Sequence, residues 1–270
     1  MMNKTILALS FFLSFIFFQQ SWADDFILMQ STTSTQNSGL LDYLLPKYKA
    51  LTGIEVRVVA VGTGQALKNA ENGNADIVMV HAKNAELKFI QSGFGVKRYP
   101  VMYNQFLIIG PASDGELNQL SKLSEVLTLV EKKGKRWISR GDLSGTHKRE
   151  LALWNKFKIN TSSADWYLDI GGGMGTAINT AVELNAYTLT DSATWIAYKN
   201  KRSHKVIYSG DPLLNNQYSL ILVNPAKHKH VKKELAMEFV GWMTGNEGQT
   251  LIGSYKLNSR QLFFPNATQW

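Results

Sequence analysis

The sequence predicts an α/β protein of two lobes, each a mainly parallel sheet flanked by helices, with two hinge strands crossing between them. Two observations support this fold class. Strand-like apolar runs alternate with helix-like periodicity along most of the chain, which is typical of right-handed strand–helix–strand units and a parallel sheet. Two long extended runs, Val101–Pro111 and Tyr218–Pro225, interrupt the alternation and are suited to connect two α/β blocks.

The predicted elements follow one another in a regular order. The first block should contain strands at 25–30, 54–62 and 75–80, helices at 40–53, 63–73 and 86–91, and a polar loop at 31–39. The second should contain helices at 120–134 and 147–157 around a strand at 136–142, and then a loop, helix, strand and helix over 166–200. A helical region over 232–253 closes the chain. We therefore expect a first lobe of residues 24–105 plus 215–270 and a second lobe of residues 106–214.

Residues 1–23 have the pattern of a secretory signal peptide. Lys4 supplies the basic start, Ile6–Phe18 is almost entirely apolar, and Ser21 and Ala23 occupy the small-residue positions of a cleavage site. The apolar run is too short to span a bilayer, although a membrane anchor is the alternative interpretation. The sequence contains no cysteine, so it can form neither a disulfide nor a lipid-bearing cysteine anchor. We expect a soluble mature protein in the periplasm, starting at Asp24.

The charge balance is basic, with 29 Lys and Arg residues against 21 Asp and Glu residues. Such a balance suits nucleic acid, a membrane surface or a small anion. The basic residues are scattered, and their one dense cluster, at 132–136, is short. Nucleic acid is not an expected partner in the periplasm, so a small anionic ligand becomes the hypothesis to test.

Three predicted strand-to-helix junctions are rich in small hydrogen-bond donors. They are Ser31–Thr35 (STTST), Gly62–Gly64 (GTG) and Ser139–His147 (SRGDLSGTH). Hydroxyls and free backbone N–H groups at a helix start are a common way to hold an oxyanion. Ser and Thr are also preferred helix N-caps, which would explain any one junction without a ligand. Three such junctions in one chain favour an anion site.

Arg140 strengthens this interpretation because it lies at the end of a predicted strand, where its guanidinium is a fork suited to an oxyanion. A salt bridge to Asp142 is the alternative role for Arg140, and the two roles are compatible. Asp142 can orient the arginine, or it can accept a proton from a ligand such as hydrogen phosphate, and we favour orientation. The glycine-rich stretch Gly171–Gly175 precedes a further helix and allows close backbone approach, although it does not form a dinucleotide or Walker motif.

Catalytic and metal-binding patterns are weak. Ser144 does not lie in a G-x-S-x-G elbow, and the sequence has no H-E-x-x-H pattern for zinc. We expect His147 to face solvent from the first helical turn. A phosphoester hydrolase using Ser144, His147 and Asp142 remains the alternative from a different functional class. The sequence predicts no cofactor and no metal site.

Several motifs together resemble one family. TTST near the start, VAVGTGQAL, NGNADIVMVHA, VMYNQFLIIGP, SRGDLSGTHKRELALW, GGGMG and AYTLTDSATW occur in order over nearly the whole mature chain. They are similar to the tungstate-binding proteins of bacterial tungstate ABC importers. The resemblance implies a type II periplasmic binding-protein fold and two lobes that close on a tetrahedral oxyanion, with no enzymatic activity. It also implies delivery to a membrane permease by a protein that we expect to be a monomer.

The same resemblance implies a set of ligand-binding residues. They are Thr32, Thr33, Ser34, Thr63, Gly64, Arg140, Ser144, Gly145, Thr146 and Gly173. Ser31 and Gly172 depart from the family's usual residues, and Gly172 puts the contribution of the glycine-rich loop in doubt. Tungsten would be bound only as the tungstate oxyanion.

The identity of the oxyanion stays open at this point. The R-x-D-x-S-G-T spacing also resembles phosphate-binding proteins of the same fold, so a phosphate or sulfate carrier is an alternative. Tungstate and molybdate have longer metal–oxygen bonds than the corresponding bonds of sulfate or phosphate, and both are fully deprotonated at neutral pH. The choice between tungstate and molybdate depends on a small difference in size, and the family resemblance alone favours tungstate.

Overall fold

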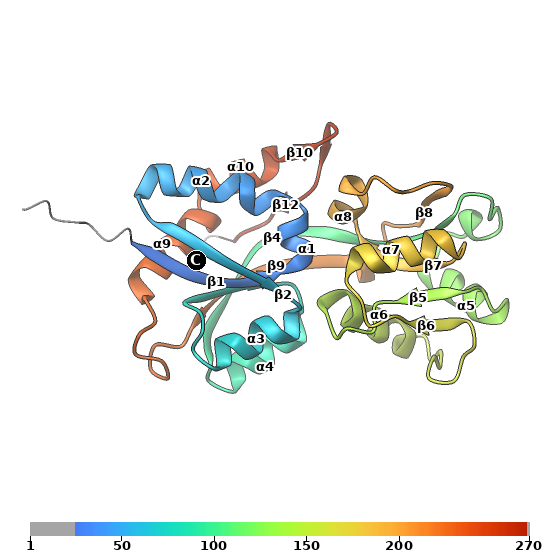
Figure 1. Cartoon of the computed structure of the whole chain (residues 1–270), viewed down its shortest axis with the longest axis horizontal. Helices are drawn as coiled ribbons and strands as arrows, with labels where there is room; N and C mark the ends of the chain where they lie inside the picture. The colour runs from blue at the N-terminus through green and yellow to red at the C-terminus, as the bar shows by residue number, and fades with distance from the viewer. Residues whose placement is uncertain (1–24, 269–270) are drawn as a thin grey trace, which may run out of the picture.

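The computed structural model describes residues 25–268, which form two α/β lobes side by side with two strands between them (Figure 1). The predicted signal peptide, residues 1–23, lies outside the described residues. Within residues 25–268, no helix combines the length and the apolar character needed to cross a membrane. The predicted fold class is confirmed, and the two connecting strands are β4 (Gly95–Pro111) and β9 (Asn215–Val223).

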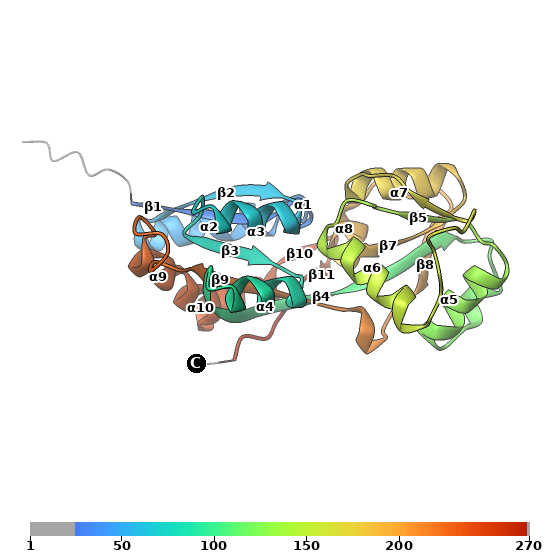
Figure 2. The ribbon, with the colours of Figure 1, turned by 90° about the horizontal axis from the view of Figure 1, so that it is seen from below.

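The first lobe is built on the strand order β2–β1–β3–β9–β4. Its strands β1 (Phe26–Thr32), β2 (Glu55–Val61) and β3 (Ile77–Val80) are parallel, and β9 runs antiparallel to β3 and to β4. Its helices are α1 (Thr33–Asn37), α2 (Leu40–Thr52), α3 (Thr63–Glu71), α4 (Lys83–Gln91), α9 (Lys233–Thr244) and α10 (Asn246–Ser254). Short strands β10 (Lys256–Leu257), β11 (Arg260–Gln261) and β12 (Phe264–Pro265) follow, and β12 pairs with β4. Figure 2 shows β2 and β3 pointing toward the second lobe.

The second lobe is built on the strand order β4–β7–β5–β6. Strands β5 (Trp137–Ser139), β6 (Tyr167–Asp169) and β7 (Tyr187–Asp191) are parallel, and β4 pairs antiparallel with both β7 and β8 (His204–Tyr208). The helices are α5 (Leu123–Lys132), α6 (Gly145–Lys156), α7 (Met174–Glu183) and α8 (Ser192–Ala197), with short 3-10 helices η1 (Leu117–Gln119) and η2 (Pro212–Leu214).

Strand β4 belongs to both lobes. Its residues up to Gln105 pair with β9, and from Phe106 onward they pair with β7 and β8. The change of partner occurs next to the pair Gln105–Asn215, where the chain leaves one lobe and returns to it. The two sheets are therefore parts of one ten-stranded sheet, and β4 sets their relative position.

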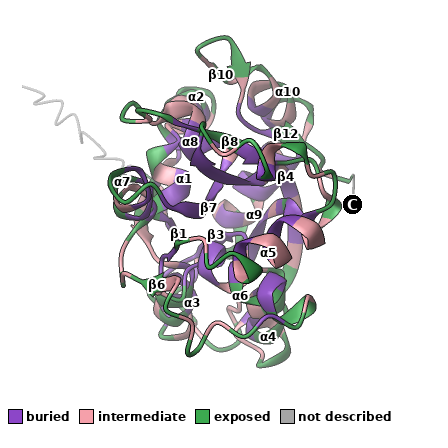
Figure 3. Ribbon diagram, turned by 90° about the vertical axis from the view of Figure 1, so that its right-hand side faces the viewer, coloured by how far each residue is buried: buried purple, intermediate pink, exposed green. Residues whose placement is uncertain are grey.

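Each lobe has its own hydrophobic core. The first contains Met29, Tyr48 and Phe239, and the second contains Trp137 and Trp154 among its largest buried side chains. The central strands β3, β7 and β9 are largely buried, whereas the outer faces of the helices are exposed (Figure 3). Helix α8 lies at the boundary, because its Ala193 packs into the core of the first lobe.

Several elements differ from the sequence prediction. The polar loop expected at 31–39 contains the end of β1 and helix α1, because the Thr32 side chain caps that helix. The closing helical region divides into α9 and α10 at Gly245, whose backbone is extended. Strand β4 begins at Gly95 rather than at Val101, and a register shift beside Pro100 accommodates the proline. Strands β6 and β8 are short and lie in segments that the sequence prediction left without a strand.

Gly110 offers a test of the packing of β4. A Cβ atom at this position would overlap the buried ring of Tyr187 and lie 3.1 Å from Ile207 Cγ1. We expect Gly110→Ala to lower the free energy of unfolding by about 1–3 kcal/mol in chemical denaturation, because overpacked cores are strained. Gly115→Ala is the matched control, since no described atom lies within 4 Å of its added Cβ. Equal losses in the two variants would contradict the packing described here.

Candidate functional site

Six helices begin at the facing edges of the two sheets. In the first lobe, α1, α3 and α4 follow β1, β2 and β3, and in the second lobe, α6, α7 and α8 follow β5, β6 and β7. Parallel strands place their carboxyl ends at one edge, so the starts of these helices gather there. The two edges touch, because a Cβ added to Gly145 would lie 2.8 Å from His81 Cε1 and 3.2 Å from Thr63 Oγ1. Arg149 also crosses the boundary and donates to the carbonyl of Asn215 at 3.2 Å.

The loop after β1 is organised by Thr32. Its hydroxyl oxygen accepts the Thr35 N–H at 3.3 Å and lies 3.1 Å from Ser34 Oγ. Thr32 and Ser34 are buried, and Ser34 Oγ lies 3.4 Å from His81 Nε2. Thr33 is the first residue of α1 and is exposed. The loop therefore places Ser34 against the end of β3.

The start of α3 has no side-chain cap, because its N-cap is Gly62. The first backbone N–H groups of a helix have no acceptor within the helix, and a glycine cap cannot supply one. Thr63 is fully buried, whereas Gly64 is exposed. A Cβ added to Gly64 would lie 3.9 Å from Lys148 Nζ. The N–H groups of Thr63 and Gly64 are thus available to an acceptor from outside the helix.

The loop after β5 holds a buried arginine. Arg140 is 3 % exposed, and its Nη2 pairs with Asp142 Oδ2 at 2.5 Å. The other carboxylate oxygen of Asp142 accepts the Ser144 N–H at 3.1 Å. Burial alone would raise the pKa of Asp142, but the hydrogen bonds from Ser144 and the charge of Arg140 outweigh it and lower that pKa. Asp142 is therefore ionised and uses both oxygens to hold the loop.

Helix α6 continues from this loop. Ser144 Oγ caps it by accepting the His147 N–H at 3.3 Å, and Thr146 in its first turn is fully buried. His147 is also buried, and its Nδ1 accepts the N–H of Leu143 at 3.0 Å. The expectation that His147 faces solvent was wrong, because this hydrogen bond turns the ring back toward the capping loop. The ring is not paired with the Ser144 hydroxyl in this arrangement.

Three buried polar atoms of predicted site residues have no hydrogen-bond partner within residues 25–268. They are Thr63 Oγ1, Arg140 Nε and Thr146 Oγ1, three of the nine such side-chain atoms in the described chain. Buried polar atoms normally have partners, because an unpaired one costs free energy. Arg140 Nε can only donate a hydrogen bond, and the two threonine hydroxyls can donate one each. A ligand rich in acceptors would satisfy all three.

Five of the six helix starts at this boundary carry no acidic residue in the first helical turn. Among the helices of residues 25–268, α1, α3, α6, α7 and α8 carry no acidic residue in the first turn. Helices α2, α5, α9 and α10 carry Asp42, Glu125, Glu234 and Glu247 there. Helix α4 carries Glu86, which is paired with Arg98 at 2.5 Å. Because helix N-termini are partially positive, this distribution favours an anion between the lobes.

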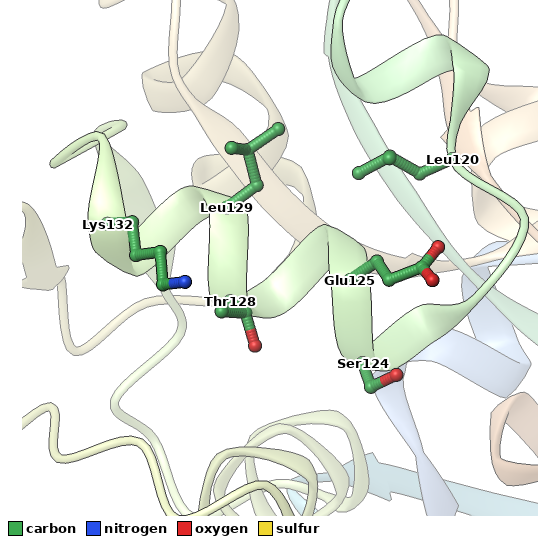
Figure 4. A pocket seen from close by; sticks show the side chains of 6 residues that line it. All are labelled: Leu120, Ser124, Glu125, Thr128, Leu129 and Lys132. Carbon is green, nitrogen blue, oxygen red and sulfur yellow. The ribbon is translucent and has the colours of Figure 1, made fainter.

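A cavity of about 220 Å³ adjoins this position between α4 and α6. Its lining includes His81, Gly145 and the basic residues Lys83, Lys148 and Arg149. A cavity of about 330 Å³ lies elsewhere, on α5 at the end of the second lobe away from the first (Figures 1 and 4). That second cavity is lined by Leu120, Ser124, Glu125, Thr128, Leu129 and Lys132, so it contains none of the predicted site residues. Of these two cavities, the basic one is suited to admit an anion.

The structure brings most of the predicted ligand residues to one boundary. Those on or beside the contacts just described are Thr32, Ser34, Thr63, Gly64, Arg140, Ser144, Gly145 and Thr146. Two of the predicted ligand residues make none of these contacts. Thr33 is exposed, and Gly173 caps α7 at an exposed position where no described atom lies within 4 Å of an added Cβ. These two residues remain candidates that no contact supports.

Sequence reasoning missed four buried polar residues at the same boundary. His81 Nδ1 lies 2.9 Å from Asn216 Oδ1, Asn216 donates to Asn104, and Asn104 donates to Asp191. A signal for them was present in the sequence. His81 directly follows the buried strand β3, and the two asparagines lie on the crossing strands β4 and β9.

A metal centre finds no support in residues 25–268, where no group of three or more His, Cys, Asp or Glu side chains is placed to hold an ion. The site offers hydroxyl, guanidinium and amide donors instead. Its chemistry is that of binding an oxyanion through hydrogen bonds.

Comparisons with known proteins agree with this geometry. The family model for the PBP superfamily domain matches residues 19–247. A tungstate-binding protein, TupA, of Peptoclostridium acidaminophilum is 42% identical over 93% of this chain and 89% of its own length. The tungstate-binding protein TupA from Desulfovibrio alaskensis G20 has a solved structure with a TM-score of 0.80 and 44% identity, covering 90% of this chain and all of that chain. The structure of the tungstate ABC transporter from Geobacter sulfurreducens gives a TM-score of 0.79 and 45% identity, covering 86% of this chain and all of that chain.

The fold and the facing helix starts define a two-lobed binding protein. With a model match over most of its length and relatives above 40% identity, the chain belongs to the PBP superfamily and, within it, to the family of these tungstate-binding proteins.

Gly145→Ala tests whether the two edges meet as described. The added methyl group would lie within 3.2 Å of both His81 and Thr63, so the lobes must separate or shift to accept it. We expect tungstate affinity, measured by calorimetry, to fall at least tenfold while the melting temperature of the free protein changes little. Gly241→Ala on α9, with open space around its added Cβ, is the control. Unchanged affinity in Gly145→Ala would show that the lobes do not approach each other here when the anion is bound.

Proposed function

We propose that this protein is a periplasmic carrier that captures tungstate, or molybdate, between its lobes and delivers it to the membrane permease of an ABC importer. The observation that carries the proposal is the set of buried donors without partners, Thr63 Oγ1, Arg140 Nε and Thr146 Oγ1, at helix starts without acidic residues. The names of the relatives support tungstate as the ligand.

The proposed binding mode uses donors from both lobes. Thr63 and the N–H groups of α3 act from the first lobe, and Arg140, Ser144 and Thr146 act from the second. Nanomolar affinity requires about −12 kcal/mol. A hydrogen bond to a charged group contributes about 1.5–3 kcal/mol, so roughly five to seven donors are enough after the costs of binding.

The geometry favours a fully deprotonated oxyanion over hydrogen phosphate. A ligand that carries its own proton needs an acceptor in the site. Asp142 is the carboxylate bonded to Arg140, and both of its oxygens are already engaged by Arg140 and Ser144. Its contacts support an orienting role over the role of proton acceptor. A phosphate carrier is therefore the weaker alternative.

The contacts also favour a carrier over a hydrolase. In a hydrolase, a histidine ring nitrogen would accept the proton of the Ser144 hydroxyl. Here Nδ1 of His147 is occupied by the Leu143 N–H, and Ser144 Oγ accepts a backbone N–H as a helix cap. We propose that the protein has no enzymatic activity and acts as a monomer.

We further propose that the lobes are residues 24–105 plus 215–270 and residues 106–214, and that the anion stabilises their closed arrangement. A ligand bonded to both lobes binds the closed state more tightly than the open state and shifts the population toward it. A permease can then recognise closure as the sign of a loaded carrier.

Calorimetry with tungstate, molybdate, sulfate and phosphate tests the proposed function. We expect tight binding of tungstate or molybdate, and we expect equimolar phosphate not to displace the bound anion near neutral pH. Preferred binding of phosphate would contradict the proposal. Sustained hydrolysis of a phosphate ester that Ser144→Ala abolishes would replace the carrier with an enzyme.

Arg140→Lys tests the role of the guanidinium. One ammonium group cannot both pair with Asp142, as Nη2 does, and present a second donor in the direction of Nε. We expect tungstate affinity to weaken by about 1–3 kcal/mol, and Arg140→Glu to abolish binding. Circular dichroism and thermal melting check that both variants fold. If a folded Arg140→Glu protein keeps its full tungstate affinity, Arg140 does not bind the anion and serves only as the salt-bridge partner of Asp142.

A further inference from the structure

His81 lies where the two lobes meet, although it was not among the ligand-binding residues predicted from the sequence. The side chain is buried at the end of β3, and its ring stacks on Tyr218 at a centroid distance of 4.7 Å. Burial lowers its pKa to about 4, and the nearby charges of Arg140 and Arg149 act in the same direction. The ring is therefore neutral near pH 7 and carries one N–H.

A chain of hydrogen bonds fixes which ring nitrogen carries that hydrogen. Asp191 Oδ1 accepts the Thr194 N–H at 2.9 Å, so the Asn104 group 3.3 Å from the same oxygen must be its amide NH₂. Asn104 then presents its oxygen to the NH₂ of Asn216 at 2.8 Å. Asn216 in turn presents its oxygen to His81 Nδ1 at 2.9 Å. Since that oxygen can only accept, Nδ1 bears the hydrogen and Nε2 is an acceptor.

Both nitrogens of the ring are thus engaged. Nδ1 donates to Asn216, and Nε2 faces the Ser34 hydroxyl at 3.4 Å. This chain of hydrogen bonds passes through β9 and β4, the two strands that join the lobes, and it ends at Asp191, the N-cap of α8. Stacking on Tyr218 restrains the ring from a further direction. The ring is held rigidly at the end of the first lobe.

Against this fixed ring lies the start of α6. His81 Cε1 and Nδ1 and Thr63 Oγ1 are the described atoms nearest to the position of a Cβ on Gly145, at 2.8, 3.0 and 3.2 Å. Gly145 directly follows Ser144 and precedes Thr146 in the proposed anion-binding loop. The ring occupies the space beside Gly145, so while it stays in place it limits how much closer this loop can come to the donors of the first lobe.

We propose that His81 is a specificity-determining residue that acts as a stop and sets how closely the two lobes approach each other. It therefore sets the size of the smallest oxyanion that both lobes can bind. This inference rests on the proposed function, because it concerns the size of the same ligand. A tetrahedral anion with long bonds reaches the donors of both lobes when the ring meets Gly145. A smaller anion such as sulfate leaves one set of donors too distant, and the stop prevents further approach.

His81→Asn is the direct test. Asparagine keeps a polar partner for Asn216 but removes the ring edge that meets Gly145, so the lobes can approach more closely. We expect the ratio of the sulfate Kd to the tungstate Kd, measured by calorimetry, to fall about tenfold. His228→Gln, on the surface of the first lobe and away from Gly145, is the matched control. An unchanged ratio would overturn the inference, whether the two affinities stay constant or weaken by the same factor.

The double variant His81→Asn with Gly145→Ala separates this role from a structural one. Removing the ring makes room for the methyl group, so the double variant should recover part of the tungstate affinity that Gly145→Ala loses alone. If the losses of tungstate affinity in the two single variants simply add in the double variant, the proposed role of His81 as a stop is contradicted. Gly145→Ala alone should raise the ratio of the sulfate Kd to the tungstate Kd. This variant provides the test if His81→Asn does not fold.

Nuclear magnetic resonance of the ring nitrogens tests the rigid placement in the free protein. With ¹⁵N-labelled histidine, the signals of His81 are those lost in His81→Asn, and we expect protonated Nδ1 and bare Nε2. The opposite tautomer would overturn the chain of hydrogen bonds that holds the stop. A wild-type protein that binds no tetrahedral oxyanion would overturn the proposed function together with this inference, whereas binding with an unchanged ratio would overturn this inference alone.

Discussion

Strand β4 belongs to both sheets and sets their relative position, so every contact between the two halves of the site depends on it. A flexible linker would let the lobes sample many orientations, but a strand that pairs with β9 over its first part and with β7 and β8 over its last part restricts them. The donors of the first lobe, such as Thr63, therefore meet Arg140 and Gly145 of the second in a defined arrangement. Bending or twisting β4 and β9 is the motion left to the lobes.

The charge at the boundary is arranged for a ligand that brings its own negative charge. Arg140 is buried, and a buried cation requires compensation. Asp142 supplies part of it. Asp191, also close to Arg140, is engaged as the cap of α8, and although burial raises its pKa, the Thr194 hydrogen bonds and the Arg140 charge oppose that rise. An oxyanion completes the compensation and also receives the unpaired donors.

The sequence was sufficient for the fold because the alternation of strands and helices is strong. It was also sufficient for the three donor-rich junctions, since Ser, Thr and Gly at a strand end are visible locally. It was not sufficient for β6, which has three residues at an edge and too little pattern to recognise. His147 is buried and accepts a hydrogen bond from the Leu143 N–H, a contact that the sequence pattern does not reveal. The role of His81 depends on Gly145 and Asn216, which are distant in the sequence and meet only in the folded chain.

The second lobe is topologically an insertion in the first. The chain leaves at Gln105 and returns at Asn215, and these two residues are partners in the same antiparallel ladder. Their adjacency means that a two-residue hairpin turn could, in geometric terms, replace the whole segment between them. The same point is a natural junction for chimaeras. Exchanging this segment between relatives would transplant one wall of the site while leaving the other wall and most of its supporting sheet intact, so divergence of ligand preference in such proteins can proceed one lobe at a time.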